Sequence, residues 1–382
     1  MSLRHLFIIT LSLLVNSVWA NAWADSGRVW RVGPGLQYET PGQLRKLVRD
    51  GDTIEILPGT YLNDSVVWHR NRLTFRGVGG RPHLQFDAHG RIGNGKAIWV
   101  IGGDDVLVEN IEFSGARVPH LNGAGIRVEG RNLTVRNCHF HHNEFAILSG
   151  RIDGRLTIEN SEFGYQHREG RFAHGVYVGD VNRLVFRGNY VHHSDEGHHL
   201  KSRARINEIA YNRMTDERDG NSSYLIDLPN CGRSVIIGNL LHQGAHTANN
   251  SAIAYGAEGC KDKPKSLQVL FNTFVNDNPL GGNFVRNWTD TPVLVSNNLL
   301  FGTGLLAEGP VQAVSNLNNA EPGLRDVAGF DYQLLPGSPA IDAADPDSQQ
   351  PLWQYRHPLQ LEPRPTVGQT DIGAYEYDTP AD

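Results

Sequence analysis

The chain has 382 residues, of which 39% are hydrophobic and 20% charged, and its formal net charge at pH 7 is -6. A net negative chain of this composition argues against general nucleic-acid binding, which depends on a broad basic surface. An acidic glycan stays compatible with it, because a local basic groove can form on an acidic protein. The 3 cysteines are too few for a disulfide scaffold.

The first 24 residues have the features of a secretory signal peptide. Arg4 and His5 precede an apolar run over residues 6–15, and Ala22-Trp23-Ala24 forms an A-x-A cleavage site. The apolar run is too short to span a bilayer, and no later segment is long enough. We therefore expect a periplasmic or secreted protein without a membrane span, with residues 1–24 removed.

Residues 25–72 are expected to form an N-terminal cap and the first coil of a repeating fold. Thr40 is a suitable helix N-cap, and Pro41 suits the first helical position. Leu44, Leu47 and Val48 would then share one face of a short helix. Such a helix would cover apolar side chains and strand edges at the open end of a solenoid.

A phrase of alternating apolar residues, an Asn and a closing apolar residue then occurs eight times. The three strictest copies span residues 106–113, 133–140 and 156–163, and in the looser copies the Asn tends to sit one place later. The copies close on Phe113, Phe140, Phe163, Val191, Met214, Leu241, Phe274 and Leu300. These closing residues are 27, 23, 28, 23, 27, 33 and 26 positions apart, and a period of this size is typical of a solenoid.

The composition of the phrase predicts the type of solenoid. Alternation with period two in Val, Ile, Leu and Phe indicates strands. A β-sandwich would need tight hairpin signals, which are scarce here. We therefore predict an all-β chain that folds as a single-stranded, right-handed parallel β-helix, with coils over residues 73–307 and a closing segment over 308–382. The repeated Asn should stack as a ladder at one turn.

The cysteines fall at different places in the repeat. Cys231 and Cys260 lie in the same turn region of adjacent coils, ten and fourteen residues before a closing residue. Because an exported protein permits disulfides, we expect these two to be bonded. Cys138 lies inside a repeat phrase and is expected to be a packed free thiol.

Polar side chains concentrate in the central coils, where 12 of the 17 histidines lie between His120 and His246. Successive side chains of a strand alternate faces, and in-register parallel strands lie about 4.8 Å apart. Aligning the apolar centres of neighbouring coils places Tyr177, Lys201 and Asp227 in one outward column, flanked by His199 and Arg203. Such a cluster is typical of an active site. The alternative is an exposed structural ion pair between Lys201 and Asp227, worth about 0 to 1 kcal/mol.

The string over residues 196–212, with Glu196, then Lys201-Ser202 and Asn207-x-Ile209-x-x-Asn212, resembles the central signature of the alginate lyase and chondroitinase B group of β-helix polysaccharide lyases. The resemblance implies that Lys201 is the base that removes the proton beside a uronate carboxylate. It also implies that Glu196 contacts calcium or the substrate, with Asp195 beside it as a second candidate for calcium. The chain departs from that pattern at Asp227, where the family has an Arg. The segments 51–61, 331–342 and 371–376 resemble the ends of bacterial parallel β-helix proteins.

The Asp at position 227 changes the expected chemistry. A neighbouring carboxylate favours the charged form of a lysine. Lys201, together with Arg203, would then neutralise a substrate carboxylate, while His199 or Tyr177 moves protons. The expected catalytic residues are therefore Lys201, His199, Tyr177 and Arg203. The expected substrate contacts are Asp227, His174, His198 and Glu196.

Two other functions stay open from the sequence. A glycoside hydrolase would need a pair of carboxylates, for which the candidates are Asp195, Glu196, Asp216, Glu217 and Asp227. A non-catalytic glycan-binding protein would need aromatic platforms, for which the candidates are Trp99, Trp288, Tyr165 and Tyr224. The reading we favour is a monomeric lyase that acts on an acidic, uronate-containing polysaccharide by β-elimination, with calcium as a candidate cofactor.

Overall fold

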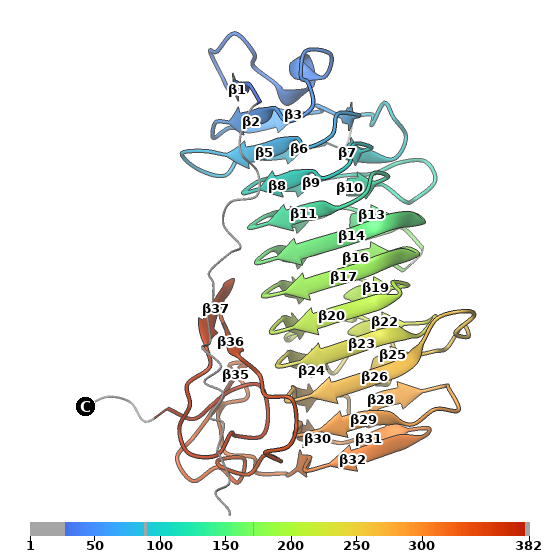
Figure 1. Cartoon of the computed structure of the whole chain (residues 1–382), viewed down its shortest axis with the longest axis vertical. Helices are drawn as coiled ribbons and strands as arrows, with labels where there is room; N and C mark the ends of the chain where they lie inside the picture. The colour runs from blue at the N-terminus through green and yellow to red at the C-terminus, as the bar shows by residue number, and fades with distance from the viewer. Residues whose placement is uncertain (1–26, 88–89, 171, 379–382) are drawn as a thin grey trace, which may run out of the picture.

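The computed structural model describes residues 27–87, 90–170 and 172–378, so the expected signal peptide lies outside the described residues. Three long parallel sheets run along a solenoid in which each coil contributes one strand to each sheet (Figure 1). The predicted right-handed parallel β-helix is confirmed. No helix in these ranges is long and apolar enough to cross a membrane.

The strands of the three sheets follow one another in chain order. Sheet A contains β1 (Val29–Val32), β2 (Thr53–Ile56), β5 (Thr74–Gly77), β8 (Leu107–Glu109), β11 (Leu133–Arg136), β14 (Ile152–Glu159), β17 (Val181–Arg187), β20 (Ile206–Ala210), β23 (Gly232–Ile237), β26 (Lys265–Leu270), β29 (Val293–Ser296) and β32 (Val311–Val314). Sheet B contains β3 (Thr60–Leu62), β6 (His83–Gln85), β9 (Glu112–Ser114), β12 (His139–His141), β15 (Glu162–Gly164), β18 (Tyr190–His192), β21 (Arg213–Thr215), β24 (Leu240–Gln243), β27 (Thr273–Asn276), β30 (Leu299–Gly302) and β33 (Leu317–Asn318). Sheet C contains β4 (Val66–Trp68), β7 (Ala97–Ile101), β10 (Ala124–Val128), β13 (Phe145–Ser149), β16 (Val176–Val178), β19 (Leu200–Ser202), β22 (Ile226–Leu228), β25 (Ser251–Tyr255), β28 (Asn283–Asn287) and β31 (Leu305–Glu308).

The closing residues of the eight phrases form one in-register column inside sheet B, from Phe113 to Leu300. All of them are buried. The rings of Phe113 and Phe140 stack with centroids 4.9 Å apart, and those of Phe140 and Phe163 with centroids 5.3 Å apart. The repeat therefore marks the core, as predicted.

The corner between sheets A and B explains why the Asn of the phrase changes position. In the first three copies the Asn occupies a left-handed backbone position, as at Asn137 with φ 50°. In later coils other residues occupy the left-handed position, and an Asn follows directly after it. The side-chain oxygen of this Asn accepts a hydrogen bond from the backbone N–H of the equivalent Asn in the preceding coil. This ladder joins Asn189, Asn212, Asn239, Asn272, Asn298 and Asn316, with N–O distances of 2.9 to 3.0 Å. The predicted ladder is thus confirmed for the later coils.

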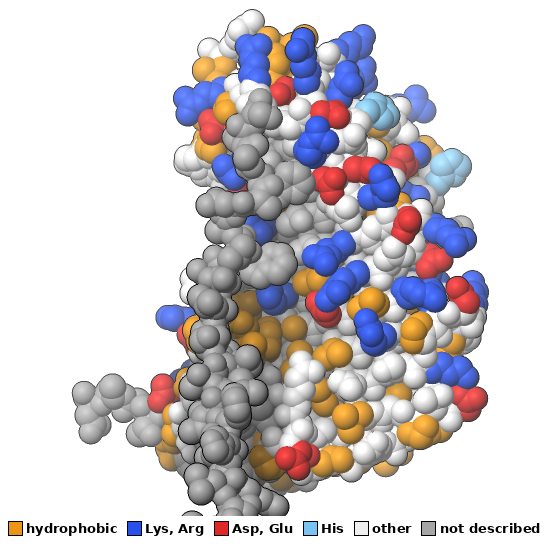
Figure 2. Space-filling view, in the orientation of Figure 1, with side chains coloured by type: hydrophobic (Ala, Val, Ile, Leu, Met, Phe, Trp, Pro, Cys, Tyr) orange, Lys and Arg blue, Asp and Glu red, His pale blue; other side chains and the backbone are white. Residues whose placement is uncertain are grey.

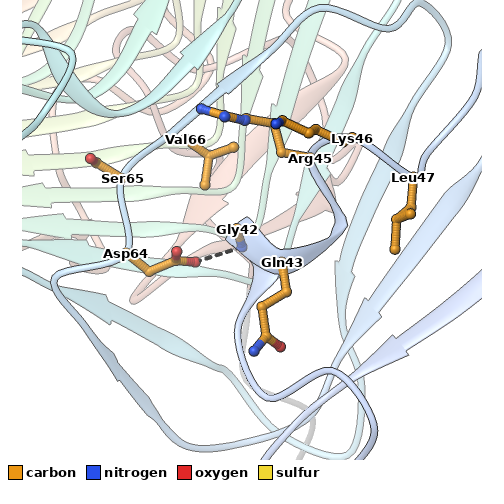
Figure 3. Close-up of a pocket in the computed structure, with 8 residues that line it drawn as sticks. All are labelled: Gly42, Gln43, Arg45, Lys46, Leu47, Asp64, Ser65 and Val66. Carbon is orange, nitrogen blue, oxygen red and sulfur yellow. Dashed lines mark hydrogen bonds between the residues drawn. The ribbon is translucent and has the colours of Figure 1, made fainter.

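The predicted helical cap over residues 40–48 is not confirmed. The segment forms only a four-residue 3-10 helix, η1 (Pro41–Leu44), followed by turns. Gly42 within it has low helix propensity, and its N–H is held by the Asp64 carboxylate at 2.8 Å (Figure 3). Leu44 and Val48 are nevertheless buried in the core of the first coils.

The C-terminal part also differs from the expected boundaries. The parallel sheets continue past residue 307 to Asn318, because β32 and β33 pair with the preceding coil. The segment after them forms two hairpin pairs, β34 (Leu324–Asp326) with β35 (Asp331–Leu334) and β36 (Trp353–Arg356) with β37 (Gln360–Pro363). It turns back along the side of the solenoid (Figure 1). There it buries a second apolar cluster against outward residues of the coils, among them Ile237 and Phe271.

Candidate functional site

The strand register of sheet C places the predicted residues in one outward column. Tyr177 on β16 pairs with Lys201 on β19, and Lys201 pairs with Asp227 on β22. The column continues towards the N-terminus through Leu148 on β13 to Arg127 on β10. The predicted alignment of neighbouring coils is therefore correct.

The ion pair in this column is buried rather than exposed. Lys201 Nζ lies 2.6 Å from Asp227 Oδ2, and the side chains are only 12% and 3% exposed. Burial raises the pKa of Asp227, and the charge of Lys201 offsets part of that effect. Asp227 Oδ1 has no hydrogen-bond partner in the described part of the chain. The expectation of an exposed, energetically minor pair is therefore wrong, because the neighbouring side chains exclude water from the carboxylate.

Arg203 joins the column to a residue that sequence reasoning missed. Its Nε donates to the Tyr177 hydroxyl at 3.0 Å, and its two terminal nitrogens contact Glu258 at 2.5 and 2.9 Å. A further hydrogen bond reaches Asn230. Burial opposes the charge on Arg203, but the bonds to Glu258 and Tyr177 raise its pKa. The hydrogen bonds from Arg203 lower the pKa of Glu258, so both groups are held ionised.

A disulfide fixes the loop that carries Glu258. Cys231 and Cys260 are bonded, with their Cα atoms 4.9 Å apart, as the sequence predicted. Between them, the Glu258 N–H donates to the Pro229 carbonyl at 2.8 Å. Cys138 is free and buried, and burial raises its pKa to about 12. The Glu258 carboxylate is thus anchored by covalent and backbone contacts within three residues of its Cα.

A stack of rings flanks the column. His174 and His198 lie face to face with centroids 4.7 Å apart, and Tyr224 stacks on His198 at 5.0 Å. His198 Nε2 is 3.4 Å from Asp227 Oδ2. Burial, with the nearby charge of Lys201, lowers the pKa of His174 to about 3, and the pKa of His198 is lowered in the same direction by burial and by His174. Both imidazoles are therefore neutral near pH 7.

His199 does not belong to this face, so that part of the prediction is wrong. Its side chain is fully buried, with Nδ1 3.0 Å from Ser194 Oγ and Nε2 3.5 Å from Asp216. The strict alternation of faces begins only with β19 at Leu200, and His199 belongs to the preceding turn. Asp216 is buried together with His199. Glu217 accepts a hydrogen bond from the Tyr190 hydroxyl on sheet B.

The acids proposed as calcium contacts lie at a turn. Glu196 is exposed with φ 50°, and Asp195 binds His167 at 2.5 Å and Asn221 at 3.0 Å. Calcium takes six to eight oxygen ligands. Among the described residues, neither acid belongs to a group of three ligand side chains that converge on one point. The calcium contact at Glu196 and Asp195 therefore stays a prediction.

A hollow of about 430 Å³ opens beside Tyr177 and Arg203 on the outer face of sheet C. Its lining includes three cations, Arg127, Arg151 and Arg203, and the apolar side chains of Phe145 and Leu148. Arg151 lies 3.6 Å from Asp180. Arg127, in contrast, forms no salt bridge with any residue the structure describes. Its charge is available to an anionic ligand.

Of the four aromatic candidates, Tyr224 and Trp288 lie near the Asp227 end of the column. Tyr224 is partly exposed, and its ring centroid is 6.3 Å from that of Trp288, over which Arg286 lies at 4.5 Å. Trp99 is fully buried in the core, so it cannot contact a glycan. Tyr165 is exposed but stacks on His142 and His193 beside sheet B.

A second hollow, of about 420 Å³, lies at the N-terminal end of the molecule beside η1 (Figure 3). It is lined by Gly42, Gln43, Arg45, Lys46, Leu47, Asp64, Ser65 and Val66. Its single carboxylate, Asp64, already accepts the Gly42 N–H. The charged column and its adjoining hollow on sheet C therefore form the stronger candidate site.

Comparison with known proteins agrees with the fold. Residues 71–170 match the family described as "Right handed beta helix region". The structure is similar to pectate lyase Pel9A, with 14% identity, a TM-score of 0.63, and coverage of 93% of this chain and 98% of that one. A rhamnogalacturonan lyase has 13% identity and a TM-score of 0.54, over 80% and 92% of the two chains.

An alginate lyase from Paenibacillus sp. str. FPU-7 has 14% identity and a TM-score of 0.53, over 74% of this chain and 98% of that one. No curated protein sequence matches the chain. At these identities the similarities bear on the fold alone. With the strand registers, they establish that this chain is a right-handed parallel β-helix.

Proposed function

We propose that the protein is an exported lyase that cleaves a uronate-containing polysaccharide by β-elimination at the outer face of sheet C. The observation that carries the proposal is the column of Tyr177, Lys201 and Asp227, joined by Arg203 and continued by the cation-lined hollow. The polysaccharide lyases named above share this fold, which supports the same class of substrate. We expect the protein to act as a monomer in the periplasm or outside the cell.

Elimination needs stabilisation of the negative charge that builds on the uronate carboxylate when the C5 proton leaves. Arg203 and Arg127 are preorganised donors along the groove, and such donors act most strongly where water is excluded. The C5–H electron pair forms the C4–C5 double bond, and the glycosidic oxygen leaves C4 with a proton.

The contacts and burial of the candidate groups support one choice of base and proton donor. His199 is buried away from the groove, and His174 and His198 are poor bases because burial lowers their pKa. Lys201 is engaged by Asp227. The Tyr177 hydroxyl lines the hollow and accepts a hydrogen bond from Arg203 Nε at 3.0 Å. We therefore assign Tyr177 as the base, and Lys201 as the proton donor and cation next to it.

The proposal is tested by incubating the protein with a panel of uronate-containing and neutral glycans, with calcium and with a chelator. A lyase produces a new carbon–carbon double bond conjugated to the carboxylate, which absorbs in the ultraviolet. New reducing ends without that absorbance would instead indicate a hydrolase. Binding without turnover would indicate a glycan-binding protein.

The assignment of Tyr177 has its own test. Tyr177→Phe keeps the ring that lies against Phe145 and His174 but removes the hydroxyl. It should abolish turnover, and the wild-type rate should rise towards pH 9 or above, as expected for a phenol or ammonium group. Tyr38→Phe, in the first coil against Trp30, is the matched control and should keep full activity. A rate that rises through pH 6 to 7 would instead assign the base to a histidine.

A further inference from the structure

The outer face of sheet B carries a second polar cluster, on a different side of the solenoid from the charged column. His83 on β6, Glu112 on β9 and His141 on β12 come from three successive coils. One ligand atom of each lies within 4.8 Å of the others, and all three side chains are partly exposed. The proposed lyase chemistry uses none of them.

The spacing of the three side chains suits a metal ion. His141 Nε2 lies 2.9 Å from Glu112 Oε1, and His83 Nε2 lies 3.5 Å from the same oxygen. Two ligands that are each about 2.1 Å from a tetrahedral ion lie about 3.4 Å apart. Both distances to Glu112 are therefore within about half an ångström of that spacing, and all three ligand atoms lie within 4.8 Å of one another. The side chains are 19 to 24% exposed, so an ion can reach the cluster from solvent.

The surroundings hold these groups in a form that can bind a metal. His141 Nδ1 faces His142 Nδ1 at 2.8 Å, so one of these two nitrogens carries the shared proton. With the proton on His141 Nδ1, its Nε2 is a free ligand, and His142 becomes the outer partner that metal-binding histidines usually have.

We propose that His83, Glu112 and His141 form a binding site for a divalent transition-metal ion of the Zn²⁺ class. Two imidazoles and one carboxylate are a ligand set that zinc accepts, whereas calcium prefers oxygen ligands alone. Ser114 Oγ lies 2.7 Å from His83 Nε2, and water would complete the coordination of the ion. The ion would tie three successive coils together on the outside of the solenoid.

A second triad of two histidines and a glutamate lies on the same sheet, and comparing the two triads indicates how many metal ions should bind. Two coils further along, His139 and His192 lie 3.6 and 3.4 Å from Glu162. This second triad is looser, and among the described residues the first triad is the one group whose ligand atoms converge. The positive charge of Arg81 also acts on His139 and Glu162 and opposes a cation there. We therefore expect one ion per chain.

The experiment titrates Zn²⁺ into untagged, chelator-stripped protein by calorimetry and measures the melting temperature in parallel. We expect one equivalent to bind and the melting temperature to rise. Glu112→Gln should weaken binding at least tenfold, and His83→Ala with His141→Ala at least a hundredfold. The matched controls are Glu129→Gln and His120→Ala, which alter residues outside both clusters and should bind Zn²⁺ as the wild type does.

Two results would overturn the proposal. One is the absence of saturable Zn²⁺ binding to the wild-type protein. The other is binding that the Glu112 and histidine variants leave unchanged. Because a variant that fails to fold would also fail to bind, the wild type is titrated separately with Co²⁺. A visible absorption band that Zn²⁺ displaces, and that Ca²⁺ does not, supports the site; Co²⁺ that binds without such a band contradicts it.

Discussion

Two columns of charged side chains run along this solenoid, one on sheet A and one on sheet C, and they differ in their surroundings. On sheet A the register aligns Glu55, Arg76, Glu109, Arg136, Glu159 and Arg187. These residues alternate in sign and pair with their neighbours, as between Arg76 and Glu109 at 2.8 Å. Figure 2 shows charged side chains of both signs over the upper coils of this face, and mostly uncharged ones below.

The column on sheet C contains the same kinds of residue in a different environment. Arg136 on sheet A is 45% exposed, whereas Lys201 and Asp227 on sheet C are 12% and 3% exposed. One oxygen of Asp227 has no partner among the described residues, and a cation-lined hollow adjoins the column. In-register stacking alone therefore does not make a charged column functional. Burial of charge next to an open groove distinguishes the candidate site.

The largest expected effect on stability comes from breaking the buried pair. Lys201→Met leaves Asp227 buried without a cation and should lower the free energy of unfolding by about 3 to 5 kcal/mol. Adding Asp227→Leu removes the stranded charge and should restore most of that loss. Denaturant unfolding of both variants measures the difference. If the single variant were as stable as the wild type, the pair of Lys201 and Asp227 would be screened by solvent like the Arg76–Glu109 pair on sheet A.

The next effect concerns the Asn ladder at the corner beside sheet A. Asn239 Nδ2 donates to Ile209 O and Asn272 Oδ1, at 3.0 and 2.9 Å, and its oxygen accepts from Asn212. Asn239→Ala leaves several of these buried groups unpaired and should cost about 2 to 4 kcal/mol. Asn137→Gly, at an exposed left-handed position in the same corner, should cost under about 1 kcal/mol. If both substitutions lowered the free energy of unfolding by similar amounts, the distinction between the buried ladder Asn and the exposed left-handed Asn would be contradicted.

Acid should weaken the protein through the histidines of sheet C. The pKa of His174 is lowered to about 3 in the folded state, so below about pH 6.5 the unfolded chain binds a proton that the folded chain does not. Stability from this group is therefore complete above that pH and falls as the pH drops towards 3. The expected loss is about 1.4 kcal/mol per pH unit. Unfolding between pH 7 and 5 measures it, and His174→Phe should flatten the slope.

The smallest effect on the free energy of unfolding is expected from removing a charge on sheet A. Arg136→Ala removes pairs with Glu109 and Glu159 at 3.6 and 3.5 Å, and exposed pairs of this kind contribute about 0 to 1 kcal/mol. The variant should keep its activity and should lose less stability in high salt than in low salt. A loss above about 2 kcal/mol would mean that the column on sheet A also holds its charges away from solvent.

The periodic part of the molecule was predictable from the sequence for a physical reason. Strands that stack in register repeat the same environment in every coil, so Phe113, Phe140 and Phe163 could be assigned to one core column. In-register stacking likewise brings Tyr177, Lys201 and Asp227 together. Equivalent turns likewise brought Cys231 and Cys260 to bonding distance.

The features that could not be predicted from the sequence lie in turns, loops and the C-terminal segment, which do not follow the repeat. Glu258 lies in the loop after β25, and its only sequence signal was its position two residues before Cys260. His199 was misplaced because a turn interrupts the alternation before β19. The C-terminal segment packs beside the coils, and outward apolar residues such as Ile237 and Phe271 were the available sign of that.

We propose that the charged column on sheet C performs chemistry and is more than a structural ion pair. The most direct test is the rate at which Lys201→Met with Asp227→Leu forms unsaturated product from a glycan that the wild type cleaves, measured where unfolding shows both proteins fully folded. If the column is catalytic, this rate should be lower than that of the wild type by about a thousandfold or more, equivalent to about 4 kcal/mol in the barrier. A folded double variant that cleaves the glycan at the wild-type rate would contradict it.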